Sequence, residues 1–341
     1  MNYELEEKIY TIGGLFSGVG GIELGFTSSA LKEKFKILWA TDKDKFASTT
    51  YRENFKHPFY EDDIRGLKGK DLEPVDILVG GFPCQPFSIA GYRKGFHDDR
   101  GNIFFQITRL IDELPQKPKA LFLENVRNIY SHDKGKTFQI IKDALADKGY
   151  CLNSYILNTA EYTPIPHNRE RTFIVCFLEG RDAYMHPFAK MTTFFMQSLP
   201  FKKTTKLRPI SDFLENKPVD EKYYIREDRY MFKELQKEMN KENTFYQWRR
   251  KYVRENKSGV CPALTANMGT GGHNVPLLKD EDGIRKLTPR ECFNFQGFPE
   301  SFVLPELADS HLYKQAGNSV TVPMVSNFAE IIYDSFENAS K

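Results

Sequence analysis

The sequence predicts an α/β fold in which a doubly wound, mainly parallel sheet is followed by a smaller, irregular domain. The first observation is an alternation of short apolar, β-prone runs with helix-like segments as far as about residue 180. The second is a change of composition beyond that point, where apolar runs become rare and Lys, Tyr and Phe crowd a polar region. We therefore predict a main domain over residues 1–180 and 313–341, a second domain over 181–285 and a connector over 286–312.

The composition is that of a globular protein with an ample core, since 40% of the 341 residues are hydrophobic and 28% are charged. No apolar run reaches the ~20 residues that span a bilayer, and the polar, acidic start of the chain is unlike a signal peptide. We therefore expect a cytoplasmic protein, and a monomer. The five cysteines stand far apart without a C-x-x-C pair, which argues against disulfides and against a structural zinc site.

The first predicted strand covers residues 9–16 and leads through a glycine-rich run, 17–21, into a helix that begins near Ile22. Such a turn lets a ligand approach the backbone closely at a helix N-terminus. Glu23 stands where the last glycine of a G-x-G-x-x-G motif would be, so the spacing does not favour a nicotinamide-dependent oxidoreductase.

Carboxylates follow the next two predicted elements. The strand over 35–40 leads to Asp42, and a short third element leads to Asp62 and Asp63. Nucleotide-binding α/β folds use an acid at the tip of the second strand to hold ribose hydroxyls. Asp42 is therefore a candidate for that contact, although either acid alone is more often a solvated turn residue.

A cysteine between two prolines is the most informative feature of the chain. The buried run 75–79 predicts a strand, and the loop over 80–91 that follows it contains Cys84 between Pro83 and Pro86. A free cysteine is usually a small buried hydrophobe. Here the glycines and prolines impose a non-helical path that presents the thiol at the carboxyl end of a strand, where open α/β sheets bind ligands. The polar segment 91–102 that follows has the composition of a mobile lid.

The remainder of the main domain repeats the strand and helix unit. We predict helices over 103–114 and 137–146 and strands over 119–123, 155–157 and 172–177. The strand over 119–123 delivers Glu124 to the edge of the sheet, where a carboxylate is costly unless it has a partner or a function.

The second domain carries two basic clusters with interleaved aromatic residues, at 201–208 and 248–254. Either cluster alone is explained by a solvated surface. One charged helix is predicted near residues 229–241, and 269–272 is a glycine-rich loop. A last helix is predicted to begin at Tyr313 and to return to the main domain.

Taken together, the segments resemble the C5-cytosine-specific DNA methyltransferases of bacterial restriction-modification systems, with the motifs in the order of that family over nearly the whole chain. The matching motifs are Phe16-Ser17-Gly18-Val19-Gly20-Gly21, Pro83-Cys84-Gln85, Glu124-Asn125-Val126, Arg169-Glu170-Arg171, Thr288-Pro289-Arg290-Glu291-Cys292 and Gln315-Ala316-Gly317-Asn318-Ser319-Val320. Any one of these could arise by chance, but their common order could not.

The resemblance implies a mechanism because C5 of cytosine is too poor a nucleophile to take a methyl group directly. Cys84 would add to C6 of a cytosine flipped out of duplex DNA, and the methyl group of S-adenosylmethionine would then pass to C5. Glu124 would donate to N3, Arg169 would hold the base at O2, and Arg171 would add to the positive field. Such an enzyme would protect host DNA from a partner restriction endonuclease.

The resemblance also implies binding residues. For the cofactor S-adenosylmethionine they are Phe16, Gly18, Val19, Gly20, Gly21, Asp42, Asp63, Ile64, Pro83, Asn318 and Ser319. For double-stranded DNA they are Ser88, Arg249, Arg250, Lys251, Gly271 and Gly272.

Four positions depart from the pattern of the family. Gly14 stands where an acid commonly precedes Leu-Phe, and Lys43 stands where a large aromatic residue often follows the acid of the second strand. His167 replaces a glutamine before the two arginines, and Ala263 replaces the first threonine of a Thr-Leu-Thr sequence. Two other functions stay open: a tRNA cytosine-5 methyltransferase, and a non-catalytic, sequence-specific DNA binder.

Overall fold

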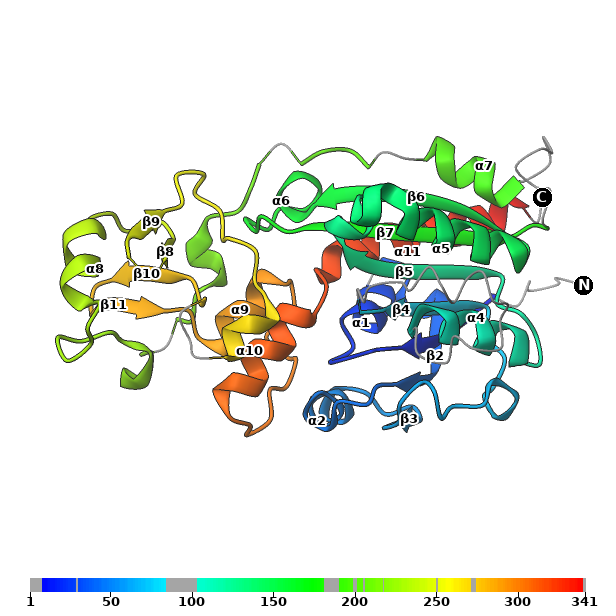
Figure 1. Cartoon of the computed structure of the whole chain (residues 1–341), viewed down its shortest axis with the longest axis horizontal. Coiled ribbons are helices and arrows are strands. Elements are labelled where there is room, and N and C mark those ends of the chain that lie inside the picture. The colour runs from blue at the N-terminus through cyan, green and yellow to red at the C-terminus, as the bar shows by residue number, and fades with distance from the viewer. Residues whose placement is uncertain are drawn as a thin grey trace, which may run out of the picture.

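The computed structural model describes residues 8–28, 30–83, 103–180, 190–198, 201–204, 206–216, 218–249, 251–270 and 274–339. Figure 1 shows two lobes, with the larger sheet on the right and a smaller sheet on the left. Within the described residues, no helix is long and apolar enough to cross a membrane.

The larger lobe is built on a seven-stranded sheet in the order β3-β2-β1-β4-β5-β7-β6. Its strands are β1 (Tyr10–Leu15), β2 (Phe35–Thr41), β3 (Phe59–Tyr60), β4 (Ile77–Gly81), β5 (Ala120–Val126), β6 (Tyr150–Asn158) and β7 (Glu170–Leu178). Neighbouring strands from β3 to β5 are parallel, whereas β7 is antiparallel to both β5 and β6. The prediction of a mainly parallel sheet is confirmed, and it brings the carboxyl ends of β1, β2, β4 and β5 to one edge.

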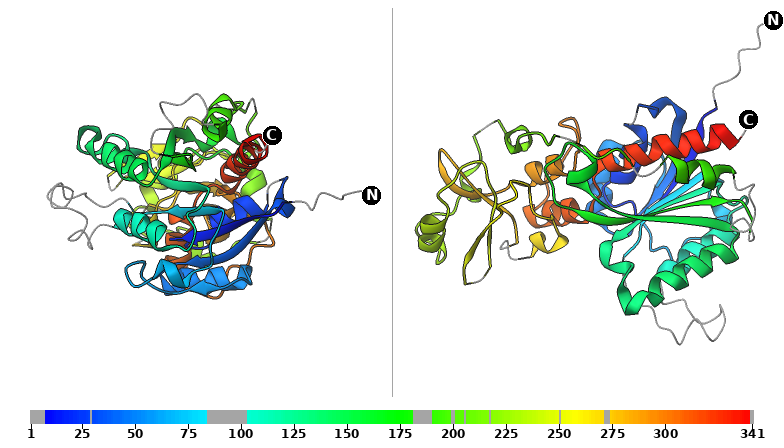
Figure 2. Two further views of the ribbon diagram at one scale, coloured as in Figure 1. Left: turned by 90° about the vertical axis from the view of Figure 1, so that its right-hand side faces the viewer. Right: turned by 90° about the horizontal axis from the view of Figure 1, so that it is seen from above.

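Helices cover both faces of this sheet, as Figure 2 shows from above. One face carries α4 (Ile103–Glu113) and α5 (Lys136–Asp147), whose apolar residues share a core with Leu15, Leu78 and Leu121. The other face carries α1 (Gly21–Thr27), α7 (Lys190–Gln197) and α11 (Val322–Ala339). Among the described residues, the other α-helices of this lobe are α2 (Lys45–Asn54) and the single turn α6 (Thr159–Tyr162). Helices on both faces make the sheet doubly wound, as predicted.

The smaller lobe contains a four-stranded antiparallel sheet in the order β11-β10-β8-β9. Its strands are β8 (Tyr246–Trp248), β9 (Val253–Glu255), β10 (Leu277–Asp280) and β11 (Gly283–Lys286). Helix α8 (Phe232–Glu238) packs Leu235 against Tyr246, Trp248 and Ile284 in a core of its own. This helix is shorter than the one predicted over 229–241.

Between the lobes lie α9 (Pro289–Phe295) and α10 (Asp309–Asn318). Thr288 caps α9 and Glu291 completes a capping box, which explains the sharp start of that helix. The prediction that the last helix begins at Tyr313 is wrong, because α10 begins at Asp309, an acid in the first turn that favours a helix N-terminus, and ends at Asn318. Of the described helices after residue 288, only α11 packs on a face of the large sheet. The domain boundaries remain a prediction. Helix α10 itself bonds to the large lobe, where Lys314 donates to Asp44 and Thr50 donates to Gln315.

Candidate active site

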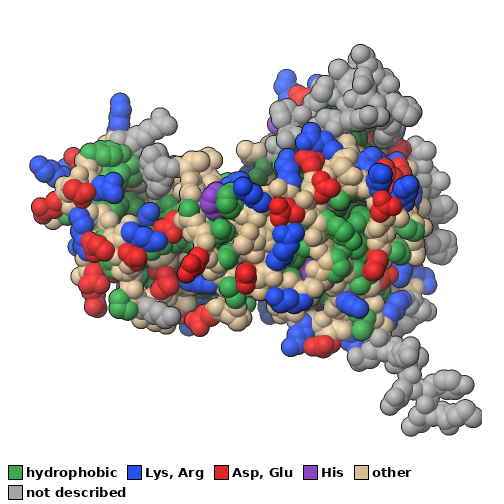
Figure 3. Space-filling view, turned by 90° about the horizontal axis from the view of Figure 1, so that it is seen from below, with side chains coloured by type: hydrophobic (Ala, Val, Ile, Leu, Met, Phe, Trp, Pro, Cys, Tyr) green, Lys and Arg blue, Asp and Glu red, His purple; other side chains and the backbone are tan. Residues whose placement is uncertain are grey.

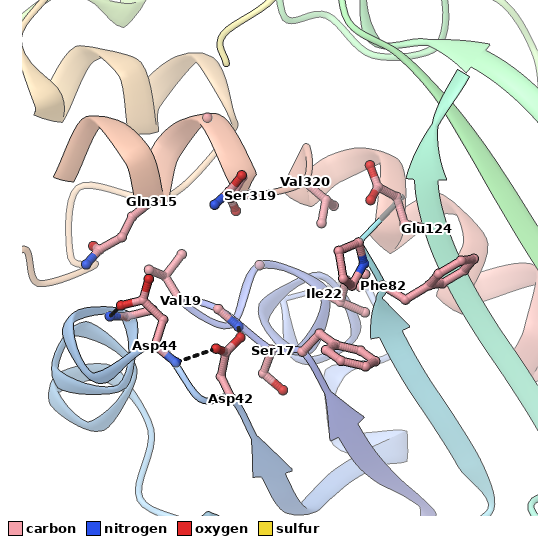
Figure 4. A pocket seen from close by; sticks show the side chains of 18 of the residues that line it. Ser17, Val19, Ile22, Asp42, Asp44, Phe82, Glu124, Gln315, Ser319 and Val320 are labelled. Atoms are coloured by element: carbon pink, nitrogen blue, oxygen red, sulfur yellow. Dashed lines mark hydrogen bonds between the residues drawn. The ribbon is translucent and has the colours of Figure 1, made fainter. Parts of the chain in front are cut away.

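A cavity of about 470 Å³ opens at the carboxyl edge of the large sheet. Figure 4 shows Asp42 and Asp44 on one side of it, Phe82 and Glu124 on another, and Gln315, Ser319 and Val320 beside the end of α10. The cavity therefore combines the tips of β1, β2, β4 and β5 with a helix from the far end of the chain. This is the edge at which parallel α/β sheets bind their ligands.

The glycine-rich turn after β1 forms the floor of the cavity. Phe16 and Gly18 have φ values of 53° and 55°, in the left-handed region that strains residues other than glycine, so Phe16 is held in an unfavourable conformation. The Gly18 N–H donates to Asp42 Oδ2 at 2.8 Å, and the Asp44 N–H donates to Asp42 Oδ1 at 2.8 Å. Burial raises the pKa of the Asp42 carboxyl despite these two bonds. Strained backbone and an oriented, partly desolvated carboxylate are typical of a ligand site.

Eight of the eleven residues predicted to bind the cofactor line this cavity: Phe16, Gly18, Val19, Gly21, Asp42, Pro83, Asn318 and Ser319. Three others do not. The Cα of Gly20 faces Phe55 and Tyr51, and Ile64 is buried in the core beneath α4. Asp63 lies 2.7 Å from Arg65 and 3.2 Å from Lys43, and the Arg65 guanidinium holds the pKa of that carboxyl well below its usual range. A sequence motif could not distinguish these residues, because neighbours in a turn face opposite sides.

An acid and an arginine meet at the other end of the cavity. Glu124 on β5 and Arg171 on β7 lie on neighbouring strands, and Glu124 Oε1 is 3.0 Å from Arg171 Nε. Both side chains are mostly buried, and both line the cavity. The Asn125 amide donates to the Phe82 carbonyl at 2.7 Å, which ties the end of β5 to the segment that follows β4. The pair is thus held in a fixed position relative to Pro83.

Arg169 lies in a different environment from the one expected. Its guanidinium donates to the Leu264 carbonyl at 2.9 Å, to the Gly317 carbonyl at 3.2 Å and to the Ser319 carbonyl. Only 2% of the residue is exposed. These bonds join the smaller lobe and the end of α10 to the large sheet. Arg169 and Arg171 both line the cavity, but Arg171 bonds to none of these three carbonyls and faces Glu124, so its position favours it over Arg169 as the arginine that contacts a bound base.

Several predicted residues lie outside the described part of the chain: Cys84, Ser88, Arg250, Gly271 and Gly272. Cys84 is the next residue after Pro83, which lines the cavity. The other four cysteines are buried, and burial raises the pKa of each thiol. None of these four is suited to act as a nucleophile.

Two of the sequence departures have a structural explanation. Lys43 forms the ion pair with Asp63 at the rim of the cavity, so it has a partner of its own instead of stacking on a ligand. His167 is fully buried, and its Nε2 accepts a bond of 3.3 Å from the Leu264 N–H. Burial, followed by the nearby arginines, lowers the pKa of His167 well below its usual value, so the ring is neutral and can accept this bond.

A second hollow, of about 420 Å³, lies on the smaller lobe. It is lined by Asn168, Gln247, Arg249, Arg254, Asn256, Pro262, Ala263, Thr265, Asn267 and Asn274. None of these residues is acidic, although the wider surface mixes both signs of charge, as one face shows in Figure 3. Arg249 was predicted to contact DNA and belongs to the hollow, whereas Lys251 does not line it. Arg254 belongs to the basic cluster at 248–254 but was not singled out, and Gln247 and Asn274 were not predicted. For Gln247 and Arg254 the alternation of polar residues along β8 and β9 was the available signal.

The sequence model of the family described as C-5 cytosine-specific DNA methylase matches residues 10–334. The chain is similar to Type II methyltransferase M.Bsp6I of Bacillus sp. (strain RFL6), with 51% identity over 328 residues that cover 95% of this chain and 98% of that protein. It is also similar to Type II methyltransferase M1.ScrFI of Lactococcus lactis subsp. cremoris, with 36% identity over 97% of this chain and 80% of that protein.

Solved structures share the fold. The crystal structure of S. pombe Dnmt2 methyltransferase superposes with a TM-score of 0.70 at 20% sequence identity, over 96% of this chain and 99% of that chain. A putative DNA modification methyltransferase encoded within a prophage of E. coli gives a TM-score of 0.68 at 21% identity, over 96% of this chain and 99% of that chain. At these identities the likeness concerns the fold alone.

Proposed function

Since the chain belongs to the C-5 cytosine-specific DNA methylase family and is a DNA cytosine methyltransferase, we propose that Cys84, Glu124 and Arg171 act on a cytosine flipped out of duplex DNA. The observation that carries this assignment is the Glu124–Arg171 pair beside Pro83 in the cavity. A base inside a duplex does not expose C6, so it must leave the stack to reach these groups.

Cys84 would form the covalent bond to C6. The other four cysteines are excluded by burial, and the residue that precedes Cys84 lines the cavity. Negative charge then develops on the ring at N3 and O2. A protonated Glu124 carboxyl would donate to N3, and the Arg171 guanidinium would stabilise the charge at O2. After methyl transfer to C5, water would take the C5 proton, the electron pair of that C–H bond would re-form the C5–C6 double bond, and the C6–S bond would break to release the Cys84 thiolate. N3 would return its proton to Glu124, which restores the ring.

The cavity also fits S-adenosylmethionine, which would supply an activated methyl group. Asp42 presents a carboxylate whose orientation is set by two backbone bonds, as binding of ribose hydroxyls requires. The Phe16 to Gly21 turn would receive the methionine end. Ser319 has a buried hydroxyl without a hydrogen-bond partner among the described residues, and with Asn318 it would form the closing wall.

The DNA would lie across the second hollow. Asn168 lines this hollow and precedes Arg169, which lines the cavity, so a flipped base and its flanking duplex could be held together. The lining contains Arg249 and Arg254 and no acidic residue, so its charge is complementary to the phosphates of DNA. Its Asn and Gln side chains add amide groups of the kind that hydrogen-bond to base edges. Arg249 and Lys251 remain candidates for phosphate contacts.

The relatives named Type II methyltransferases suggest a restriction-modification role, in which methylation protects host DNA from a partner endonuclease. The proposal includes a cytoplasmic monomer, because the substrate is cellular DNA and one chain carries both the acid–arginine pair and the polar hollow.

The test is transfer of labelled methyl from S-adenosylmethionine to duplex DNA and, in parallel, to tRNA. We expect label at cytosine C5 in DNA, a covalent adduct on duplexes that contain 5-fluorocytosine, and loss of both in Cys84→Ala with the fold retained. Turnover by Cys84→Ala would overturn the mechanism. Preferential labelling of tRNA would overturn the assigned substrate, and DNA binding without label or adduct would identify a non-catalytic binder.

A further inference from the structure

Gly14, the last but one residue of β1, has no room for a side chain. A Cβ built on it would lie 2.1 Å from Glu23 Oε1 and 2.6 Å from Ser17 Oγ. Glu23 stands on the first turn of α1, so a carboxyl group from the helix occupies the space in which a side chain at position 14 would begin. The carboxyl group of Glu23 on α1 thus lies where an acidic side chain at position 14 of β1 would lie.

The Glu23 carboxyl belongs to a cluster of buried polar atoms that lack partners. Among the described residues, no bond of full hydrogen-bond geometry reaches either Glu23 oxygen, Ser17 Oγ or Thr41 Oγ1. The Ser17 hydroxyl is nevertheless the polar group close enough to Glu23 to lower the pKa of its carboxyl. Only 1% of Glu23 is exposed. A carboxyl group with a purely structural role is normally paired or serves as a cap. Ser17, in front of this cluster, lines the cavity of the active site.

The charges around Glu23 leave it without a counter-ion. The titratable groups that face it are Asp42, which raises its pKa further, and Tyr51, whose own pKa Glu23 helps to raise. Burial is the main cause that raises the pKa of Glu23 to about 7, and the neighbouring Ser17 hydroxyl offsets it in part. A cation placed beside Ser17 would remove this deficit.

We propose that Glu23 supplies the negative charge of the cofactor site, in place of the acid that is absent at position 14. Glu23 would also position Ser17, so that the Ser17 hydroxyl holds the cationic amino group of the methionine part of S-adenosylmethionine. This inference rests on the proposed function, because it assumes that cofactor. Glu23 acts through Ser17 and through its charge, and is therefore a positioning residue rather than a catalytic one.

Calorimetric titration of the full chain with S-adenosylmethionine at pH 8 tests the proposal. Glu23→Gln keeps the shape and removes the charge, and we expect its Kd to rise by about tenfold or more while its melting temperature does not fall. Glu33→Gln is the matched control, since Glu33 is exposed, pairs with Lys32 and does not line the cavity. An unchanged Kd in Glu23→Gln, with normal binding by the wild type, would overturn the inference. Absence of binding by the wild type would instead contradict the proposed cofactor.

Moving the acid from position 23 to position 14 provides a second test, again measured as the affinity for the cofactor. Gly14→Asp alone should weaken binding, because the new side chain collides with the Glu23 carboxyl, and Glu23→Ala alone should weaken it by removing the anion. The double variant has both the space and an anion, so we expect it to bind the cofactor more tightly than either single variant. Binding by the double variant that is weaker than by both singles would contradict the replacement of one acid by the other. The Glu23→Gln titration stands independently if the double variant does not fold.

Discussion

Arg169 and Arg171 stand two residues apart in the chain, yet their surroundings differ. Arg169 is buried among backbone carbonyls of the smaller lobe and of the end of α10. Arg171 faces a carboxylate at the cavity. The first arrangement holds segments of the chain together, and the second places a charge where a reacting base would lie.

Paired conservative substitutions separate the two roles. Lysine keeps the charge but loses the planar fork of donors. We expect Arg171→Lys to lower kcat by about 100-fold with little change in melting temperature, since a positioned donor to developing charge is lost. Arg169→Lys should instead lower the free energy of unfolding by about 3 kcal/mol, because buried carbonyls lose their donors. Steady-state kinetics and thermal melts measure both, and the reverse pattern would contradict the assignment.

The buried Glu23 carboxyl predicts a dependence of stability on pH. Its pKa is about 7 in the folded chain against an ordinary 4.5. Below pH 4.5 the group is protonated in both states and costs nothing. Between pH 4.5 and 7 it ionises in the unfolded chain first, so its cost to the folded state grows, and above pH 7 the cost is complete, of the order of 3 kcal/mol.

The melting temperature of the wild type should therefore fall relative to that of Glu23→Gln as the pH rises from 4.5 to 7, with a constant difference above that range. Melts of the two proteins without cofactor across this pH range measure the effect. A difference that does not vary with pH would show that Glu23 is not the buried titrating group.

At the scale of elements, the hairpin of β8 and β9 presents its polar groups together. Gln247 pairs directly with Arg254, so their side chains share one face of the sheet. Arg249 donates to Gln247 Oε1 at 2.8 Å, so one donor of the Arg249 guanidinium is already engaged. Among the described residues, no hydrogen bond or ion pair is recorded for the Arg254 guanidinium, which leaves its donors available to a ligand in the hollow.

We predict that Arg254 reads a base and that Arg249 contacts a phosphate. Arg254→Ala should relax sequence preference at one position of the methylated site, at a cost of about 1–3 kcal/mol for the preferred base. Arg249→Ala should weaken binding to all sequences and reduce the slope of log Kd against log salt by about 1. Sequencing of methylated cytosines in a random DNA library distinguishes the two, with exposed Lys237 on α8 changed to alanine as control. Uniform weakening by Arg254→Ala would remove it from base recognition.

At the scale of the whole molecule, one apolar cluster spans both lobes. It joins Val19 and Ala47 of the large lobe to Leu278 of the small sheet through Phe293 and Phe295 of α9. Beside it, Arg285 on β11 and Glu291 on α9 form a buried pair at 2.8 Å. Because the cores are continuous, we expect the lobes to unfold together rather than as independent domains.

Phe295→Ala tests this coupling. The side chain is fully buried, so its removal should cost about 3–5 kcal/mol and move one calorimetric transition of the whole chain. Tyr252→Ala, at a site that is 60% exposed, should leave that transition in place. Two resolved transitions in the wild type, of which Phe295→Ala shifts only one, would contradict a shared core.

The sequence by itself determined the alternation that builds the large sheet, the glycine turn after β1, the acid near the end of β5 and the arginines at the start of β7. These features are local, because periodicity, turn residues and strand ends are set by neighbours in the chain. Eight of the residues assigned to the cofactor line one cavity, although the same reasoning began helix α10 four residues late, at Tyr313 instead of Asp309.

Only the tertiary structure decided which way each side chain faces. It set Arg169 on carbonyls from residues 264, 317 and 319 and left Arg171 beside Glu124. It turned Gly20 and Ile64 away from the cavity, and it filled the space at Gly14 with Glu23 from the following helix. The physical reason is that these contacts join segments that are distant in the chain or turn between elements, and their direction depends on packing that no local pattern records.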